Sequence, residues 1–339
     1  MFEVNTKQLK EAMIRDFKVG LVPMVASSPG MGKSDVVKNI AEEFKLKLID
    51  LRVSQCEPVD MKGFPDTKDD RMAFLPPKYF PLSTDPIPAG YSGWLLFLDE
   101  FNSASREVEG AAYRLILDRT IEEHSLHPKC VIAAAGNLVS DRAIVNVAST
   151  ATTSRLSHYR LVVDCNIWVE WANSHNIDHR IISFIKFKPS VLHKFNPDTD
   201  ELTFPCPRTF EFASKVISGS ETIDTIDKIR LAGTIGEGTS IEFVTYCEIY
   251  KSLPTIEQIL NDPKTGWKVP TEISEQYAIT TMLSHNITET NVDIIMTAIE
   301  RLPIEFQVIT LKDIYGRQPD LKDHLRIKKW VSVHASEMF

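Results

Sequence analysis

A glycine-containing stretch followed by a lysine and a serine holds the residues of this sequence that could do chemistry. It runs Ser27-Ser28-Pro29-Gly30-Met31-Gly32-Lys33-Ser34. Between a strand and a helix, a glycine turn aims backbone N–H groups and the positive helix end at one anionic point. There a lysine can reach the β- and γ-phosphates, and a serine hydroxyl is placed for Mg²⁺. The stretch predicts a nucleoside triphosphate site.

The flanking segments have the patterns that such a loop requires. Residues 21–26 form an apolar run typical of a buried strand, and apolar residues recur at helical spacing over residues 36–44. Only the first glycine of the G-x-x-x-x-G-K-[ST] pattern is missing, and Ser27 takes its place, which makes the first turn of the loop less free. A glycine turn with a solvated lysine is the competing interpretation.

A second motif ends an apolar run in two carboxylates. Trp94-Leu95-Leu96-Phe97-Leu98 is followed by Asp99 and Glu100. A continuous apolar run is typical of a strand buried on both faces of a parallel sheet, and ligands bind at the carboxyl ends of such strands. There Asp99 can hold Mg²⁺, and Glu100 can polarise the water that attacks the γ-phosphate. The alternative is a strand that ends in a solvated acidic turn.

A third buried strand, residues 130–136, ends at Asn137. We expect Asn137 beside the end of the Asp99 strand, where its amide can hydrogen-bond the attacking water or the γ-phosphate, although an asparagine after a glycine is also a common turn residue.

Residues 54–93 form a long proline-rich connection. It is either a functional insertion with a small element of its own or a plain surface excursion.

Composition bounds the remaining possibilities. The 339 residues suffice for two or three domains, and the net charge of −8 does not favour nucleic acid as the main partner. No apolar run approaches the length of a membrane span, and the N-terminus does not resemble a signal peptide. Five scattered cysteines without a C-x-x-C pair indicate reduced thiols, so we expect a cytoplasmic protein.

The chain divides by pattern into an α/β part and a helical part. We expect a nucleotide-binding core over residues 1–165, a parallel sheet flanked by helices. An all-helical lid over 166–250 follows, with a mobile connection near 189–207, and then a helical C-terminal extension over 251–339. The basic segment at 322–330 is interpreted as a solvated helix face, with contact to nucleic acid or an acidic partner as the alternative.

Together these motifs resemble the MoxR group of AAA+ ATPases over roughly residues 5–215. The resemblance is carried by four stretches: Ser28–Ser34, Glu57–Gly63, Leu98–Asn102 and Ala133–Asn137. It implies that ATP and Mg²⁺ are bound, with the phosphates held by Pro29, Gly30, Met31, Gly32, Lys33 and Ser34. It also implies Walker A residues Lys33 and Ser34, Walker B residues Asp99 and Glu100 with Ser34 and Asp99 at the metal, and Asn137 as sensor 1.

The resemblance also implies catalytic arginines. Arg155, just before a strand expected over residues 159–164, matches the arginine finger that acts on ATP held by a neighbouring subunit. Its rivals are Arg119, Arg142 and Arg160. Arg208 resembles the sensor 2 arginine of the lid.

The implied function is hydrolysis of ATP to ADP and phosphate in a homo-oligomeric ring, six subunits in most relatives. Turnover would drive remodelling or chaperone-like maturation of a protein client. A protein with a von Willebrand factor A domain is the first partner to seek. Two alternatives stay open: an AAA+ motor acting on nucleic acid, and an ATP-gated assembly scaffold with little turnover.

Overall fold

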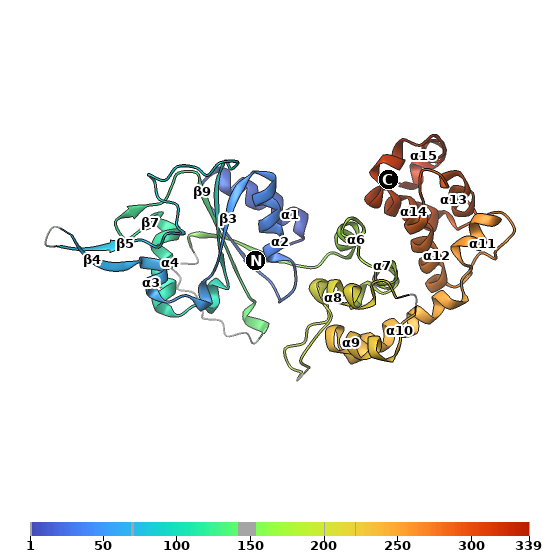
Figure 1. Cartoon of the computed structure of the whole chain (residues 1–339), viewed down its shortest axis with the longest axis horizontal. Helices are drawn as coiled ribbons and strands as arrows, with labels where there is room; N and C mark the ends of the chain where they lie inside the picture. The colour runs from blue at the N-terminus through green and yellow to red at the C-terminus, as the bar shows by residue number, and fades with distance from the viewer. Residues whose placement is uncertain (1, 69–70, 142–153, 200, 221, 339) are drawn as a thin grey trace. The chain divides into compact units, whose positions relative to one another are not determined.

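The computed structural model describes residues 2–68, 71–141, 154–199, 201–220 and 222–338. They form two compact units, one of Met1–Val163 with Asn196–Thr199, the other of Asp164–Phe195 with Asp200–Phe339. Figure 1 shows a sheet with helices in the first unit and helices in the second. Within the described ranges, no helix has the length and apolar character needed to cross a bilayer.

The first unit is built on a six-stranded sheet in which every neighbouring pair of strands is parallel. Its order across the sheet is β1 (Glu3–Val4), β10 (Leu156–Leu161), β2 (Val22–Ala26), β9 (Cys130–Gly136), β6 (Gly93–Asp99) and β3 (Leu46–Arg52). Because the strands are parallel, their carboxyl ends share one edge, and the loop after β2 and the carboxylates after β6 lie along it.

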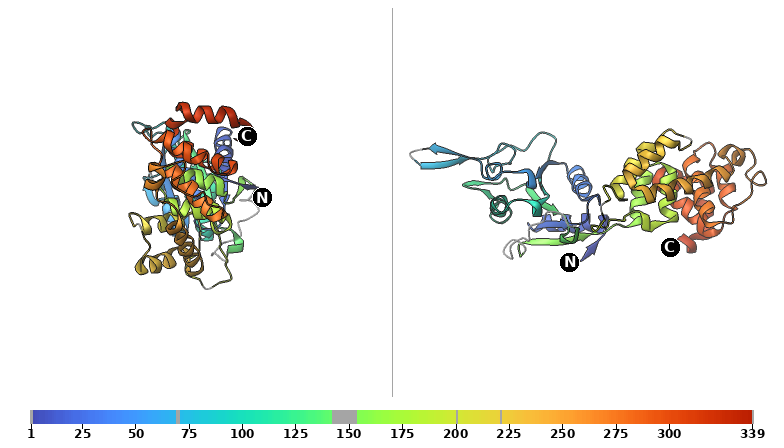
Figure 2. Two further views of the ribbon diagram at one scale, coloured as in Figure 1. Left: turned by 90° about the vertical axis from the view of Figure 1, so that its right-hand side faces the viewer. Right: turned by 90° about the horizontal axis from the view of Figure 1, so that it is seen from below.

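Helices cover both faces of this sheet because the central strands are apolar on both sides. On one face, Leu95 and Phe97 of β6 pack in a core with α1 (Thr6–Lys18) and α2 (Lys33–Glu43). On the other face, Leu96 and Leu98 pack with α4 (Arg106–Leu117). The alternation of strand side chains therefore divides one apolar run between two cores. The right-hand view of Figure 2 shows the first unit from below.

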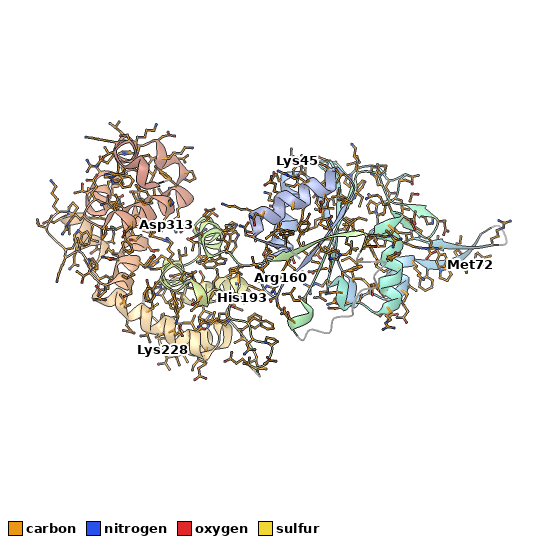
Figure 3. The ribbon with its side chains drawn as sticks, turned by 180° about the vertical axis from the view of Figure 1, so that it is seen from behind. Lys45, Met72, Arg160, His193, Lys228 and Asp313 are labelled. Carbon is orange, nitrogen blue, oxygen red and sulfur yellow. The ribbon has the colours of Figure 1, made fainter. Side chains whose placement is uncertain are left out.

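The long connection between β3 and β6 carries elements of its own. A 3₁₀ turn, η1 (Val53–Gln55), and the short helix α3 (Pro58–Lys62) precede an antiparallel hairpin of β4 (Phe64–Lys68) and β5 (Arg71–Leu75). Met72 on this hairpin is exposed and is labelled in Figure 3. The hairpin is anchored at Phe74, whose N–H donates to Glu123 Oε1 at 2.8 Å.

Glu123 belongs to the turn of a second hairpin. Its strands are β7 (Thr120–Ile121) and β8 (His124–Ser125). Two 3₁₀ turns complete the described elements of this unit: η2 (Phe101–Ser103), directly after Glu100, and η3 (Val139–Asp141).

The second unit is helical over its described residues. Its first helices are α6 (Cys165–Ser174), α7 (His179–Phe187), α8 (Pro207–Ile217), α9 (Thr225–Ile235) and α10 (Glu237–Ser252), with η4 (Pro189–Val191) after α7. Its later helices are α11 (Ile256–Asn261), α12 (Ile273–Asn286), α13 (Val292–Ile299), α14 (Ile304–Arg317) and α15 (Leu325–Met338), with η5 (Pro319–Asp323) before α15. The predicted α/β class, with a parallel sheet between helices and a helical C-terminal part, is confirmed.

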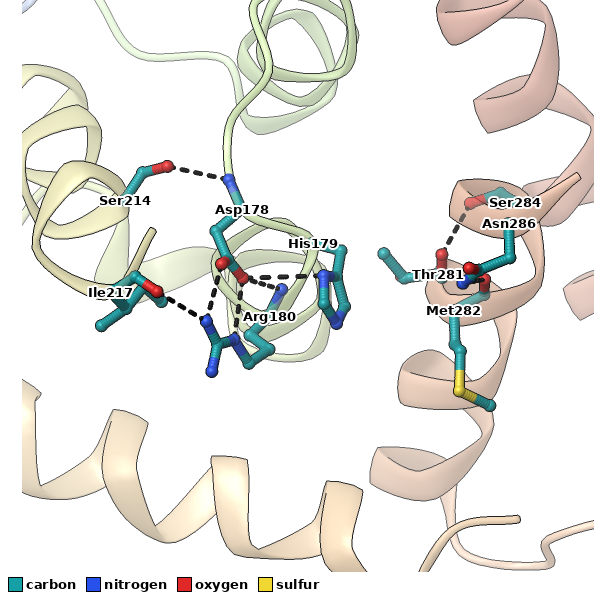
Figure 4. Close-up of polar contacts among 9 residues, drawn as sticks. All are labelled: Asp178, His179, Arg180, Ser214, Ile217, Thr281, Met282, Ser284 and Asn286. Carbon is teal, nitrogen blue, oxygen red and sulfur yellow. Dashed lines mark hydrogen bonds and ion pairs between the residues drawn. The ribbon is translucent and has the colours of Figure 1, made fainter. Parts of the chain in front are cut away.

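Polar contacts fix the start of α7. Asp178 caps the helix by accepting from Arg180 N, and its carboxylate also accepts from Arg180 Nη2 at 2.8 Å. Arg180 Nη2 donates in addition to the carbonyl of Ile217, and the N–H of Asp178 donates to Ser214 Oγ, which ties α7 to α8. Figure 4 shows this cluster with His179 next to Asp178.

Helices on both sides of residue 250 belong to this one unit. The ammonium of Lys186 on α7 pairs with Asp313 on α14, and both side chains are more than nine-tenths buried. Asn173 Nδ2 on α6 donates to the same carboxylate at 3.3 Å. The boundary that separates a lid from a C-terminal extension at residue 250 stays a prediction.

Candidate nucleotide-binding site

The loop between β2 and α2 has the backbone that its glycines predict. Gly30 and Gly32 have φ angles of 76° and 87°, in the left-handed region where a side chain is strained. Gly32 is the N-cap residue of α2, and no side chain caps that end. The first N–H groups of an α-helix have no partner within the helix, so those of α2 are available to an anion at the carboxyl edge of β2.

Lys33 is held at this edge by oxygens from two strands. Its Nζ donates to the carbonyl and the hydroxyl of Ser27, each at 3.0 Å, and to Asn137 Oδ1 at 3.4 Å. Ser27 is fully buried, and it is not among the described residues with a positive φ. The serine that replaces the first glycine therefore causes no left-handed strain, and its hydroxyl adds a contact to the lysine.

Ser34 lies near the end of β6 although β9 separates β2 from β6. Its hydroxyl donates to Asp99 Oδ2 at 3.4 Å, while Asp99 Oδ1 accepts from the N–H of Glu100 at 2.8 Å. A hydroxyl and a carboxylate this close can share one Mg²⁺, an ion that proteins hold by one or two carboxylates together with phosphate oxygens and water. In the described ranges, no group of three or more His, Cys, Asp or Glu side chains is placed to hold a metal ion.

Glu100 has an unusual backbone and a fixed side chain. Its φ of 55° is left-handed, which costs a residue other than glycine on the order of 1–3 kcal/mol. The hydroxyl of Ser54, in η1 directly after β3, donates to its carboxylate. Because β3 pairs with β6, with Arg52 opposite Asp99, the second residue after β3 can reach the residue that follows β6. The sequence analysis missed Ser54, whose only signal is a polar residue after the neighbouring strand.

Asn137 follows β9 and is held by Asn102, a second residue that the sequence analysis did not assign a role. The Asn102 amide accepts from the N–H of Asn137 at 3.1 Å and donates to its carbonyl at 2.7 Å. The expected position of Asn137 beside the Asp99 strand is seen, since β9 pairs directly with β6. The structure thus brings Lys33, Ser34, Asp99, Glu100 and Asn137 to one edge.

Beside this edge, a cavity of about 450 Å³ opens at the end of β3. Its lining residues are Asp50, Leu51, Arg52, Gln55, Cys56, Asp60 and Tyr79. Burial, and then the charge of Asp99, raise the pKa of Asp50, while Lys38 and Arg52 oppose the rise. Burial, and then Asp60, raise the pKa of the Cys56 thiol. Burial is thus the main reason that the charged forms of Asp50 and Cys56 are disfavoured at the end of β3.

Arg155 lies at the opposite edge of the sheet. Leu156, the residue after it, pairs with Val22 at the amino end of β2. The Arg155 guanidinium donates to the hydroxyl of Tyr113 on α4 and lies 5.2 Å from the centre of that ring. The arginine is exposed and lies at the edge of the sheet where the strands begin.

The other candidate arginines have different surroundings. Arg119 donates to the carbonyl of Cys130, and Arg160 pairs with Glu3 at 3.2 Å. Arg142 lies outside the described residues. Arg208 is an exposed residue of the second unit, one position after the proline that begins α8.

No family model matches the chain, and no curated protein matches it. Among solved structures it is similar to a protein described as an ATPase from Cytophaga hutchinsonii, with 12% identity over 98% of this chain and 89% of that chain and a TM-score of 0.39. It is also similar to NtrX from Brucella abortus in complex with ATP, with 13% identity over 98% of this chain and a TM-score of 0.39, and it spans only 64% of the NtrX chain.

A third similar structure is the RuvB Holliday junction branch migration motor of Thermotoga maritima. The identity is 13% over 97% of this chain and 86% of that chain, with a TM-score of 0.33.

Proposed function

We propose that this chain is a Mg²⁺-dependent AAA+ ATPase that hydrolyses ATP to ADP and phosphate. The observation that carries the proposal is the convergence of side chains after three strands. Lys33 Nζ lies 3.4 Å from Asn137 Oδ1, and Ser34 Oγ lies 3.4 Å from Asp99 Oδ2. Phosphoryl transfer requires positioning and charge stabilisation from the protein, and these groups supply both at one edge of the sheet.

The loop and the helix end bind the phosphates in this proposal. Backbone N–H groups over residues 30–32 and the first turn of α2 face the anion, and Lys33 contributes a full positive charge. Ser34 and Asp99 would hold Mg²⁺, whose contribution is to neutralise charge on the β- and γ-phosphate oxygens. The 3.4 Å contact between these two side chains supports this assignment.

Glu100 and Asn137 act on the reacting groups. Glu100 orients and polarises the attacking water, and its left-handed backbone together with the Ser54 hydroxyl set the direction of its carboxylate. Asn137 offers its amide to the γ-phosphate or to the same water. Both residues end neighbouring strands, so they approach the phosphate from adjacent positions.

Arg155 is proposed as the finger that acts on a neighbouring subunit. Arg160 pairs with Ala26, the last residue of β2, and Arg155 comes five residues before Arg160. At about 3.3 Å per residue, Arg155 therefore lies roughly 17 Å from the carboxyl end of β2 along the strand direction. A side chain at that edge does not reach the phosphates of its own subunit. Arg119 donates to the carbonyl of Cys130 on β9 and Arg160 pairs with Glu3 on β1, so both are held at the sheet, whereas the contact of Arg155 is to Tyr113 on α4.

A finger supplied from another subunit implies head-to-tail contacts that close into a ring, and we propose a homohexamer. A finger of this kind is worth about 10³–10⁵ in rate, so turnover would depend on assembly. Arg208 is proposed as sensor 2.

The finer assignment follows the resemblance to the MoxR group. Turnover would remodel or mature a protein client in the cytoplasm, with a von Willebrand factor A domain protein as the partner to test first. The stretch Glu57–Gly63, which contributes to that resemblance, forms α3 and its cap beside the cavity at the end of β3.

Two substitutions test the site. Lys33→Ala should abolish ATP binding, whereas Glu100→Gln should bind ATP and lose hydrolysis, since only the second acts after binding. Glu107→Gln, an exposed carboxylate on α4, is the matched control and should retain wild-type turnover. Wild-type rates in Glu100→Gln would contradict the proposal. ATP binding by the wild-type chain without turnover would favour the scaffold, and turnover that requires DNA would favour the nucleic acid motor.

A further inference from the structure

Asn102 makes a two-bond clamp on the peptide groups of Asn137. It lies in η2, two residues after Glu100, and is half-buried. Its Oδ1 accepts from the N–H of Asn137 at 3.1 Å, and its Nδ2 donates to the carbonyl of the same residue at 2.7 Å. One side-chain amide thus satisfies both backbone groups of Asn137, as a neighbouring strand would.

The clamp lies where the sheet ladder ends. Pairing between β6 and β9 stops at Leu98 opposite Ala134, whereas pairing between β2 and β9 continues to Ala26 opposite Gly136. Beyond Ala134, β9 is therefore held on its β2 side by backbone pairing. On the β6 side, the two hydrogen bonds between Asn102 and Asn137 take the place of backbone pairing.

Gly136 is the residue that lets Asn102 approach. A Cβ at Gly136 would lie 2.2 Å from Asn102 Oδ1 and 2.5 Å from its Cγ, distances that no real contact has. The φ of Gly136 is outside the left-handed region, so the glycine is required for space and not for backbone conformation. The Asn102 side chain can occupy this position only because residue 136 has no side chain.

The clamp connects two of the groups that the proposed mechanism needs. Asn137 Oδ1 reaches to 3.4 Å from Lys33 Nζ, and the position of this amide depends on the backbone that Asn102 holds. Asn102 itself is anchored in the turn that directly follows Glu100. The Glu100 carboxylate and the Asn137 amide are consequently linked through one short segment.

We propose that Asn102 is a positioning residue for ATP hydrolysis, which fixes the Asn137 amide relative to Glu100 at the γ-phosphate. This inference rests on the proposed ATPase function. Asn102 acts through Asn137 and contacts neither nucleotide nor water in this account. A misplacement of about 1 Å in a reacting group can cost about 10²-fold in rate, so the clamp has a measurable effect.

The first test compares kcat with ATP affinity. In Asn102→Ala, kcat should fall about 10- to 100-fold. The dissociation constant for ATP, measured by calorimetry, should change little, because the loop and Lys33 bind the phosphates. Asn102→Asp replaces the donor to the Asn137 carbonyl with an oxygen and should also lower kcat. Asn39→Ala, an exposed asparagine of α2, is the control and should behave as wild type.

A double-mutant cycle separates positioning from a general structural effect. If Asn102 acts through Asn137, then Asn102→Ala should lower kcat in the wild-type background and cause no further loss in Asn137→Ala. Hydrogen exchange should show that the Asn137 amide loses protection in Asn102→Ala. Multiplicative losses in the double variant would overturn the inference.

The outcomes separate this inference from the proposed function. An active wild-type chain whose kcat is unchanged in Asn102→Ala and Asn102→Asp overturns the positioning role alone. A wild-type chain that binds ATP without turnover under any condition overturns the proposed ATPase and the positioning role with it. Should Asn102→Ala fail to fold, the nearly isosteric Asn102→Asp decides the question.

Discussion

The hydroxyl of Ser54 donates a hydrogen bond to the carboxylate of Glu100, so the second residue after β3 sets the direction of the carboxylate that follows β6. The backbone of Glu100 is left-handed, with a φ of 55°. This relationship joins the end of an edge strand to the residue proposed to polarise the attacking water.

Removing this hydroxyl should affect turnover more than binding. In Ser54→Ala, kcat should fall about tenfold, equivalent to about 1.4 kcal/mol, because the carboxylate loses its orienting donor. Ser54→Thr keeps a hydroxyl at the same place and should retain most of the rate. Steady-state kinetics measure both. A tenfold rise in KM at unchanged kcat would instead assign Ser54 to nucleotide binding.

Tyr113 should support the proposed finger. The Arg155 guanidinium donates to the Tyr113 hydroxyl and lies 5.2 Å from the ring centre. Tyr113→Ala removes both contacts and should lower the rate of the assembled ATPase about 3- to 10-fold. This loss is equivalent to about 0.7–1.4 kcal/mol, within the range of about 0.5–2 kcal/mol typical of a cation–π contact. Tyr113→Phe keeps the ring and should lose less. Equal losses in the two variants would show that the ring makes no contribution.

Breaking the buried ion pair between Lys186 and Asp313 should strongly destabilise the second unit. Lys186→Met leaves a carboxylate that is 6% exposed without its cation, and removing one partner of a buried pair costs about 3–5 kcal/mol. Urea unfolding followed by tryptophan fluorescence measures this loss, since every tryptophan except Trp94 lies in the second unit.

An exposed pair in the same unit provides the control for that measurement. Lys188 and Glu242 lie 2.7 Å apart with side chains 41% and 38% exposed, so Lys188→Met should cost less than about 1 kcal/mol. Lys186→Met/Asp313→Leu should recover much of the loss, because no uncompensated charge remains. Equal effects of the two lysine substitutions would contradict the special role of the buried pair.

The second unit should lose stability in mild acid. The rings of His179 and His285 lie 5.1 Å apart between α7 and α12. Burial, and then the charges of Arg317 and His179, lower the pKa of His285 from its ordinary 6.5 to about 3, with Asp178 opposing. Burial also lowers the pKa of His179, where Arg180 and Arg317 add to the effect and Asp178 opposes it.

The free energy of unfolding should fall with pH because, below pH 6.5, the unfolded chain binds more protons at these two histidines than the folded chain does. Their contribution to stability is therefore present above pH 6.5 and is lost as pH falls, for His285 toward about 3. The slope is at most about 1.4 kcal/mol per pH unit for each group. Urea unfolding from pH 7 to pH 5 should show this slope, and His285→Gln should reduce it. An unchanged slope in His285→Gln would refute the assignment.

The sequence predicts those parts of the fold and site that depend on local pattern. β2, β6 and β9 are continuous apolar runs, and the loop over residues 29–34 combines glycines with a lysine and a serine, so each was visible without tertiary information. Strand β10 begins earlier than expected, at Leu156 and not near residue 159, because backbone pairing with β2 extends over Ser157 and His158, which have no apolar signal.

The residues that sequence reasoning missed depend on which strands are neighbours. Ser54 meets Glu100 only because β3 pairs with β6, and Asn102 meets Asn137 only because β6 pairs with β9. Strand order is set by the packing of the whole sheet, so neither contact follows from spacing along the chain. Both contacts join residues at the ends of adjacent parallel strands.

The most direct test of the account mixes two inactive variants. Glu100→Gln lacks the group that polarises water but retains Arg155, whereas Arg155→Ala retains Glu100 and lacks the finger. If sites are completed between subunits of a ring, each variant alone should be inactive. Their mixture with ATP and Mg²⁺ should then regain turnover at sites where an Arg155→Ala subunit meets a Glu100→Gln neighbour. A mixture as inactive as its components, or an Arg155→Ala variant as active as wild type, would contradict the account.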